Sequence, residues 1–233
     1  MPSTIPEEVK TLPAYTLAEA ARYVGVSENT LRMWFRGRPP RSSKKGEFLR
    51  AAVKPILPTE AGPREPLSFL DVIEAHVLFS LRKSYKFPMG KVKTAMEYLE
   101  TLGGDLMVLA RKDFFHDHGN IYLGQDQNLL SLTERGQIAD KTILANGLHQ
   151  ITYGRDGYAD EFFPNFRNVQ QRTFVINPSV NYGYISIVKH GIGADALAAR
   201  YQAGEKPIDI AEDCGISIED VVESIRWHDQ LAA

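Results

Sequence analysis

Apolar side chains near the start of the chain recur at helical spacing in two short segments separated by a tight turn. Thr16 and Glu19 have the spacing of a capping box, which predicts the start of the first helix. Gly25 is suited to end that helix in a left-handed conformation, and Ser27 is suited to cap the second helix. The second helix would bury one stripe, formed by Leu31, Trp34 and Phe35. This pattern predicts a helix-turn-helix.

The second predicted helix carries polar and basic residues on the side away from its apolar stripe. Glu28, Arg32 and Arg36 are spaced by four, so they would form one row that faces solvent. A helix that reads a DNA groove needs this layout, because Asn pairs with adenine and Arg pairs with guanine or with phosphate. We therefore expect Asn29 and Arg32 to contact bases.

A basic loop follows this helix, which Pro39 and Pro40 would stop, and Gly46 permits a turn within the loop. The segment from Arg22 to Lys54 contains nine basic and two acidic residues, a net charge of +7. A charged surface loop without a ligand is one explanation. We prefer a wing that contacts DNA phosphates, because the loop directly follows the recognition-like helix. The residues expected to contact DNA are Thr16, Ser27, Glu28, Asn29, Thr30, Arg32, Arg36, Arg38, Arg41, Lys44 and Lys45.

Residues 14–103 resemble the DNA-binding domain of MerR-type regulators. The likeness rests on YTLAEAARYVGVSENTLRMW, with its T-L-R-x-W ending, and on LSFLDVIEAHVLFSLRK after the wing. A further helix would follow at KVKTAMEYLETL, with its apolar side chains on one face. The resemblance implies a winged helix-turn-helix that binds DNA. It ends at Gly103–Gly104, and neither a long dimerising helix nor a set of metal-sensing cysteines follows.

The middle of the chain, residues 104–172, has short apolar or aromatic runs broken by turn residues, which predicts a small mixed sheet. His116 and His118 alternate, so both could face one metal ion, but the adjacent Gly119–Asn120 favours a hairpin turn. The segment shows neither a phosphate-cradling glycine loop nor a nucleophile elbow. We therefore expect no metal, no cofactor and no enzymatic activity.

The last part of the chain has the layout of a second helix-turn-helix. Gly215 would end one helix, and Ser217 would cap the next with Asp220 three residues on. From Glu205 to Asp229, eight acidic residues face only two basic ones, a net charge of −6 that would repel a DNA backbone. An ordinary solvated surface and a dimer or partner-binding module both explain this pattern. The residues expected at a dimer contact are Ile208, Ile210, Ile218, Val221, Val222 and Ile225.

The stretch from Phe174 to Trp227 resembles the small antitoxin domain found beside PIN-type ribonuclease toxins in bacteria. The shared features are the I-N-P-S-V start, Gly183, R-Y-Q-A-G-E and I-A-E-D-C-G-I-S-I-E-D-V. A MerR-like front joined to this domain resembles the longer VapB-type antitoxins. The resemblance implies two tasks, which are to repress the operon through operator DNA and to bind a cognate PIN-type ribonuclease toxin.

PIN-type toxins, by the same resemblance, hold a divalent metal with a cluster of carboxylates. A basic or aromatic segment of the antitoxin could fill that cleft. The candidate toxin-binding residues are Arg155, Arg167, Arg172, Arg226 and Trp227. For Trp227 the favoured alternative is that its ring finishes the apolar face of the last helix.

Composition is consistent with a folded, reduced protein. Of the 233 residues 43% are hydrophobic and 24% are charged, no apolar run is long enough for a membrane span, and Cys214 is the single cysteine. We expect a cytoplasmic, mainly α chain with a small β component in three parts. These are a winged helix-turn-helix at 14–103, a small β-containing region at 104–172 and a three-helix unit at 173–233.

Two functions remain open on the sequence alone. The first is a non-enzymatic, homodimeric antitoxin that binds operator DNA and a PIN-type ribonuclease toxin, with no membrane partner. The alternative is a stand-alone MerR-like transcriptional regulator that senses a small ligand in the middle sheet. The alternative predicts that a ligand changes operator affinity, whereas the antitoxin requires a protein partner.

Overall fold

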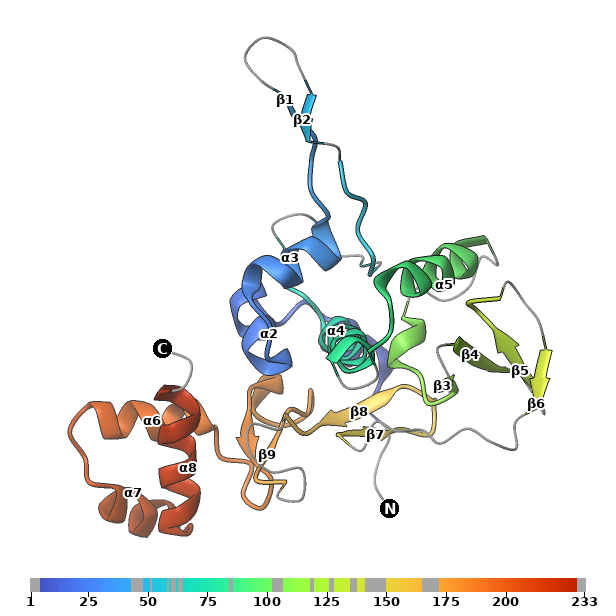
Figure 1. Cartoon of the computed structure of the whole chain (residues 1–233). Coiled ribbons are helices and arrows are strands. Elements are labelled where there is room, and N and C mark those ends of the chain that lie inside the picture. Colours follow the sequence, from blue (N-terminus) through green and yellow to red (C-terminus); the bar gives the residue numbers. More distant parts are fainter. Residues whose placement is uncertain are drawn as a thin grey trace. The chain divides into compact units, whose positions relative to one another are not determined.

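Helices and short antiparallel strands alternate along the chain in the computed structural model (Figure 1). The structure describes residues 5–42, 48–50, 52–57, 59, 62, 65–83, 86–101, 107–117, 120–125, 128–134, 138–140, 150–164 and 172–229. They form a larger unit, residues 10–149 and 153–159, and a smaller unit, residues 1–9, 150–152 and 160–233. The predicted mainly α fold with a small β component is confirmed. The region expected at 104–172 is divided between the two units.

In chain order the elements begin with α1 (Glu7–Thr11), α2 (Leu17–Val24), α3 (Glu28–Arg36), β1 (Arg41–Ser42), β2 (Phe48–Arg50), α4 (Phe69–Lys83) and α5 (Met89–Thr101). They continue with η1 (Val108–Ala110), β3 (Phe114–Asp117), β4 (Asn120–Gln125), β5 (Asn128–Ser131) and β6 (Ile138–Asp140). The strands β7 (Ile151–Tyr153) and β8 (Ala159–Phe162) form a hairpin that has residues in both units.

The predicted helix-turn-helix is formed by α2 and α3. The Glu19 carboxylate accepts hydrogen bonds from the Thr16 N–H and hydroxyl, each at 2.8 Å, while the Thr16 hydroxyl caps the helix. The helix α2 ends at Gly25, whose φ of +79° is left-handed, and the Ser27 hydroxyl caps α3 by accepting from the Thr30 N–H at 3.2 Å. The local signals in the sequence therefore specify this motif.

The basic loop forms a short hairpin after α3, in which β1 pairs antiparallel with β2 (Figure 1). Below the hairpin the backbones of Arg38 and Val53 exchange two hydrogen bonds of 2.8 Å. Gly37 is required here, because a Cβ atom would lie 2.1 Å from the Val53 carbonyl oxygen and the φ of Gly37 is +62°. The fold of this segment agrees with the wing prediction.

The helix α4 is buried on nearly all sides and forms the centre of the larger unit. It packs against α2 and η1, and its buried residues run from Phe69 to Leu81 with one exception, Phe79. Its start is a buried capping box in which the Asp71 carboxylate accepts from the Ser68 N–H and hydroxyl, each at 2.8 Å. Burial raises the pKa of Asp71 above its usual value, and the Ser68 hydrogen bonds oppose that shift.

The strands β3 to β6 form a four-stranded antiparallel meander. Asp117 on β3 pairs antiparallel with Asn120 on β4, and His118 and Gly119, on which the predicted hairpin turn falls, lie outside the described residues. Among the residues that the structure describes, no group of three histidine, cysteine or acidic side chains is arranged to hold a metal ion.

The smaller unit combines short strands with three helices. Its elements are β9 (Phe174–Val175), η3 (Asn181–Gly183), β10 (Ser186–Ile187), α6 (Ala194–Gln202), α7 (Pro207–Cys214) and α8 (Ile218–Asp229). β9 pairs antiparallel with β10, and α6 packs along α8. Buried residues from all three helices, among them Leu197, Ile210 and Val221, form the core of the helical part.

Candidate nucleic-acid interface

The exposed side of α3 carries three of the side chains expected to contact DNA. Asn29 is exposed, and the side chains of Glu28 and Arg32 are 45% and 48% exposed. Glu28 accepts an ion-paired hydrogen bond from Arg32 one helical turn away. On the opposite side Leu31 and Trp34 are buried, as predicted. The helix thus presents one amide and one guanidinium on a rigid, capped scaffold, which is the chemistry of direct base reading.

The hydroxyl groups in the predicted set act first as helix caps. Thr16 is bonded to Glu19, and the Ser27 and Thr30 hydroxyls are 2.9 Å apart at the start of α3. Thr16 and Ser27 are nevertheless exposed, at the N-termini of α2 and α3. The unpaired N–H groups and dipole of a helix N-terminus favour a phosphate at such positions.

Arg36 departs from the solvent-facing row expected for residues 28, 32 and 36. Its side chain is half-buried, and its guanidinium donates to the carbonyl oxygens of Gly62 and Glu65, the latter at 2.8 Å. The Glu65 carboxylate in turn accepts from the Gly62 N–H at 2.6 Å. Arg36 therefore fastens the end of α3 to the segment between the wing and α4. This role of Arg36 depends on tertiary contacts, which cannot be read from the spacing of residues along the helix.

The remaining basic residues of the predicted set are Arg38, Arg41, Lys44 and Lys45. Arg38 is half-buried where its backbone pairs with Val53. Arg41 belongs to β1, opposite Arg50 of β2, so two arginines occupy paired positions of the hairpin. Lys44 and Lys45 lie outside the described residues. The hairpin places arginines directly after α3, as a phosphate-contacting wing requires.

The second helix-turn-helix, α7 and α8, carries the opposite charge. Exposed carboxylates lie on and around both helices, at Glu205, Asp209, Glu212, Asp213, Glu219 and Asp229.

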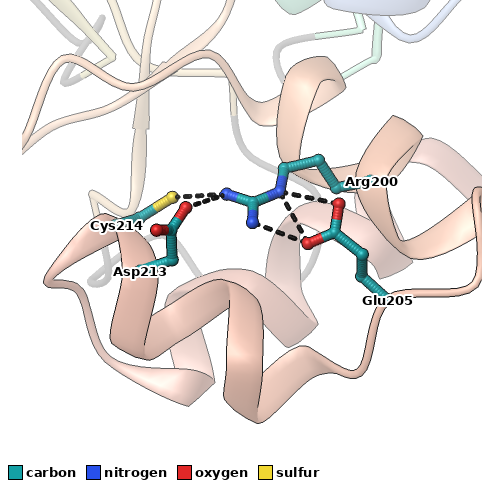
Figure 2. A network of polar contacts seen from close by, with 4 residues as sticks. All are labelled: Arg200, Glu205, Asp213 and Cys214. Atoms are coloured by element: carbon teal, nitrogen blue, oxygen red, sulfur yellow. Dashed lines mark hydrogen bonds and ion pairs between the residues drawn. The ribbon is translucent and has the colours of Figure 1, made fainter.

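One arginine, Arg200, lies among these carboxylates. Figure 2 shows the Arg200 guanidinium bonded to Glu205 at 2.6 to 3.1 Å, to Asp213 at 2.8 Å and to the Cys214 thiol at 3.3 Å. The hydrogen bonds from Arg200 hold the pKa of Glu205 below its usual value. The cluster ties the end of α6 to α7 and leaves the surface with excess negative charge, which disfavours a nucleic-acid backbone.

The residues expected at a dimer contact are divided between core and surface. Ile210 and Val221 are fully buried within the smaller unit, so their side chains are not accessible to another chain. Val222 and Ile225 are half-buried, whereas Ile208 and Ile218 are 45% and 38% exposed. Helical spacing identified the apolar face correctly, but α6 covers part of it.

The candidate toxin-binding residues have different environments. Trp227 is 2% exposed and its ring centroid lies 5.5 Å from that of Phe174, so Trp227 belongs to the core and cannot act as a plug. Arg226 is exposed and pairs with Glu223, and Arg172 lies over the Phe163 ring at 4.3 Å. Arg155 is exposed in the larger unit, and Arg167 lies outside the described residues.

Sequence reasoning missed one prominent surface feature, the exposed aromatic turn at η3. Tyr182 is 89% exposed and has a left-handed backbone. The Asn-Tyr-Gly run contains the turn-forming residues that could have revealed it, since Asn and Gly favour this conformation.

Known proteins share both the front motif and the whole architecture. The profile of a family described as "Putative DNA-binding HTH domain" matches residues 13–96. The "Putative antitoxin VapB45" of Mycobacterium tuberculosis (strain ATCC 25618 / H37Rv) is 25% identical over 235 aligned residues, which cover 95% of each chain. The predicted resemblance to VapB-type antitoxins with a helix-turn-helix is confirmed.

A solved structure supports the fold over nearly the full length. The crystal structure of Rv2018 from Mycobacterium tuberculosis is 21% identical and has a TM-score of 0.58. The match covers 92% of this chain and 98% of that one. None of the helices within the described ranges is long and apolar enough to span a membrane.

Proposed function

We propose that the chain is the antitoxin of a type II toxin–antitoxin module. It represses its own operon by binding operator DNA through the larger unit, and it neutralises a PIN-type ribonuclease toxin by direct binding. The observation that carries the DNA half is the exposed pair Asn29 and Arg32 on the capped helix α3, followed by a basic wing. The full-length similarity to an antitoxin of the VapB type supports the other half.

Each part of the DNA-binding surface has a separate role. Asn29 and Arg32 read bases in the major groove, and Arg41, Lys44 and Lys45 contact phosphates. Arg36 fastens α3, since two of its guanidinium nitrogens donate to the carbonyl oxygens of Gly62 and Glu65. Two larger units on one homodimer place their α3 helices in successive major grooves of a palindromic operator, about 34 Å apart.

The wing is tested by the salt dependence of operator binding. Arg41→Ala and Lys44→Ala each weaken binding to all duplexes alike and reduce the slope of log K against log salt by about one unit. Fluorescence anisotropy with a duplex from the chain's own promoter measures both quantities. Lys206→Ala is the matched control, because Lys206 is an exposed lysine on the acidic unit. Unchanged slopes in both wing variants remove the wing from the interface.

Toxin neutralisation is tested with the ribonuclease that the proposed module encodes together with this chain. The purified ribonuclease cleaves RNA, and addition of an equimolar amount of the full chain stops cleavage. Replacing Arg155, Arg167, Arg172 and Arg226 together by Ala restores cleavage if basic residues fill the toxin's active site. Full inhibition by that variant shows that these arginines do not act as a plug. Continued cleavage with the unmodified chain contradicts the antitoxin assignment itself.

A further inference from the structure

Three successive residues in the smaller unit adopt a left-handed backbone. The φ angles of Asn181, Tyr182 and Gly183 are +47°, +55° and +81°. Glycine adopts this conformation freely and asparagine tolerates it, but a tyrosine rarely does, because its Cβ approaches the following carbonyl group. A tyrosine held in this conformation is strained, and strain of this kind concentrates at functional positions.

The surrounding structure holds the turn firmly. The Asn177 side chain accepts from the Ser179 N–H at 2.8 Å and donates to Glu161 at 3.2 Å. The Tyr184 N–H donates to the Asn181 carbonyl at 3.0 Å, which closes the turn. The Asn181 side chain lies so near Gly193 that a Cβ there would be 2.7 Å from its Nδ2 atom. The conformation of the turn is therefore fixed by the smaller unit before any partner arrives.

The turn presents apolar surface to solvent. Tyr182 is 89% exposed, Tyr184 41% and Val188 42%. A second turn, Val188–His190, follows β10, and a Cβ at the adjacent Gly191 would be 3.4 Å from the side chain of Val180, which precedes η3. We name five exposed residues of these two turns the aromatic turn surface, and they are Tyr182, Tyr184, Val188, Lys189 and His190.

The sequence that contains the aromatic turn surface differs in charge from the sequence of helices α7 and α8. No aspartate or glutamate occurs from Phe174 to Ala194, whereas eight occur from Glu205 to Asp229. The phenol groups, Lys189 and His190 offer hydrogen-bond donors, so the complementary surface is an apolar pocket with carboxylates at its rim. A single lysine is too little cationic charge for a phosphate backbone, and exposed tyrosines are typical of protein interfaces.

We propose that the aromatic turn surface is the contact by which the chain binds its ribonuclease partner, with the Tyr182 ring entering an apolar pocket rimmed by carboxylates. The inference rests on the proposed function, since it requires a protein partner. It assigns to Tyr182 the aromatic contact that Trp227 cannot make, because Trp227 is buried. A turn that is already ordered loses little conformational freedom on binding, which favours affinity.

Substitution at Tyr182 separates binding from stability. Tyr182→Asn removes the ring but suits the left-handed backbone, so the melting temperature stays the same or rises. Affinity for the purified ribonuclease, measured by isothermal titration calorimetry with the full chain, falls about 30-fold or more, as for a central interface tyrosine. Tyr182→Phe keeps most of the affinity, and Lys189→Glu weakens binding by about tenfold. Tyr201→Ala, at a 44% exposed tyrosine on α6, is the matched control and binds normally.

The outcomes distinguish this inference from the proposed function. If the unmodified chain does not bind the ribonuclease, the proposed function fails. If the unmodified chain and Tyr182→Asn bind equally, the function stands and the aromatic turn surface is not the contact. Equal losses in Tyr182→Asn and Tyr201→Ala also overturn the inference. So does a change in the mass of the free chain by light scattering in Tyr182→Asn, because the surface is then an interface between two copies.

Discussion

In both α2–α3 and α7–α8, an eight-residue helix ends at a left-handed glycine, and a serine two residues later caps the next helix. Val26 and Ile216 donate equivalent backbone hydrogen bonds of 3.0 Å to Ala21 and Ala211. The capping distances are equal as well, since the third residue after each serine donates its N–H at 3.2 Å. The two motifs share one backbone plan.

Their exposed positions differ at the points where a DNA reader makes contact. Counted from the capping serines, Asn29 corresponds to Glu219 and Arg32 corresponds to Val222. The buried positions are alike, because Leu31 and Val221 are both fully buried. The backbone plan of a helix-turn-helix therefore does not select the partner. The side chains on the outer face select the partner, through the sign of their charge and their hydrogen-bonding groups.

The largest effect is expected from the one tryptophan in each unit, Trp34 and Trp227, which are 6% and 2% exposed. Trp34→Ala and Trp227→Ala each lower the free energy of unfolding by about 3–5 kcal/mol, because each leaves a cavity. Urea unfolding followed by circular dichroism measures the loss, and Tyr201→Ala serves as an exposed control. A loss below about 1 kcal/mol for Trp227→Ala contradicts its place in the core.

Replacing an arginine on the second helix should weaken DNA binding in the α2–α3 motif but not in the α7–α8 motif. Arg32→Ala weakens operator binding by about 1–3 kcal/mol and relaxes the preference at one base pair. Arg226→Ala is the matched control, because Arg226 is also exposed and paired with a glutamate on its own helix. Anisotropy titrations with operator duplexes that vary at each position measure both effects. Equal losses in the two variants contradict the assignment of base reading to α3.

Replacing either turn glycine, Gly25 or Gly215, should lower the free energy of unfolding by a similar amount. A Cβ atom at Gly25 or Gly215 meets nothing within 4 Å among the described residues, so the cost of alanine comes from the left-handed backbone. Gly25→Ala and Gly215→Ala each cost about 1 kcal/mol in unfolding free energy, and asparagine at either position costs less. Thermal melts of the four variants check this. A much larger loss at one glycine shows that the two turns differ in their packing.

The smallest expected effect is an opposite response of the two units to acid. Burial holds the pKa of Asp71 above its unfolded value, so the contribution of Asp71 to the stability of the larger unit becomes more favourable as the pH falls through the folded pKa towards about 3.9. Arg200 holds the pKa of Glu205 below its unfolded value, so its contribution is lost as the pH falls below about 4.3.

Single-tryptophan variants measure this response, since Trp34→Phe leaves only Trp227 as a fluorescent reporter and Trp227→Phe leaves only Trp34. Urea titrations at successive pH values then follow each unit. Asp71→Asn and Glu205→Gln should flatten the respective pH dependence. An unchanged pH dependence in Asp71→Asn or in Glu205→Gln contradicts the corresponding pKa shift.

Much of the fold could be predicted from the local sequence, because helix caps and turns are specified by residues only three or four positions apart. The capping box at Thr16, the serine caps and the turn glycines are all where the sequence predicts them. The wing hairpin and the β3–β4 pairing follow from prolines, glycines and alternating apolar residues in the same way. Such signals need no contact with distant parts of the chain.

The local sequence did not predict which individual side chains are exposed to solvent. Arg36 bonds to carbonyl groups near residue 62, Ile210 and Val221 are covered by their neighbouring helices, and Trp227 packs against Phe174. Tyr182 is exposed because contacts around Asn177 and Gly193 hold its turn. The sequence by itself specifies the helices, their caps and the charge of each segment. Tertiary packing decides which groups face solvent, because burial depends on residues far away along the chain.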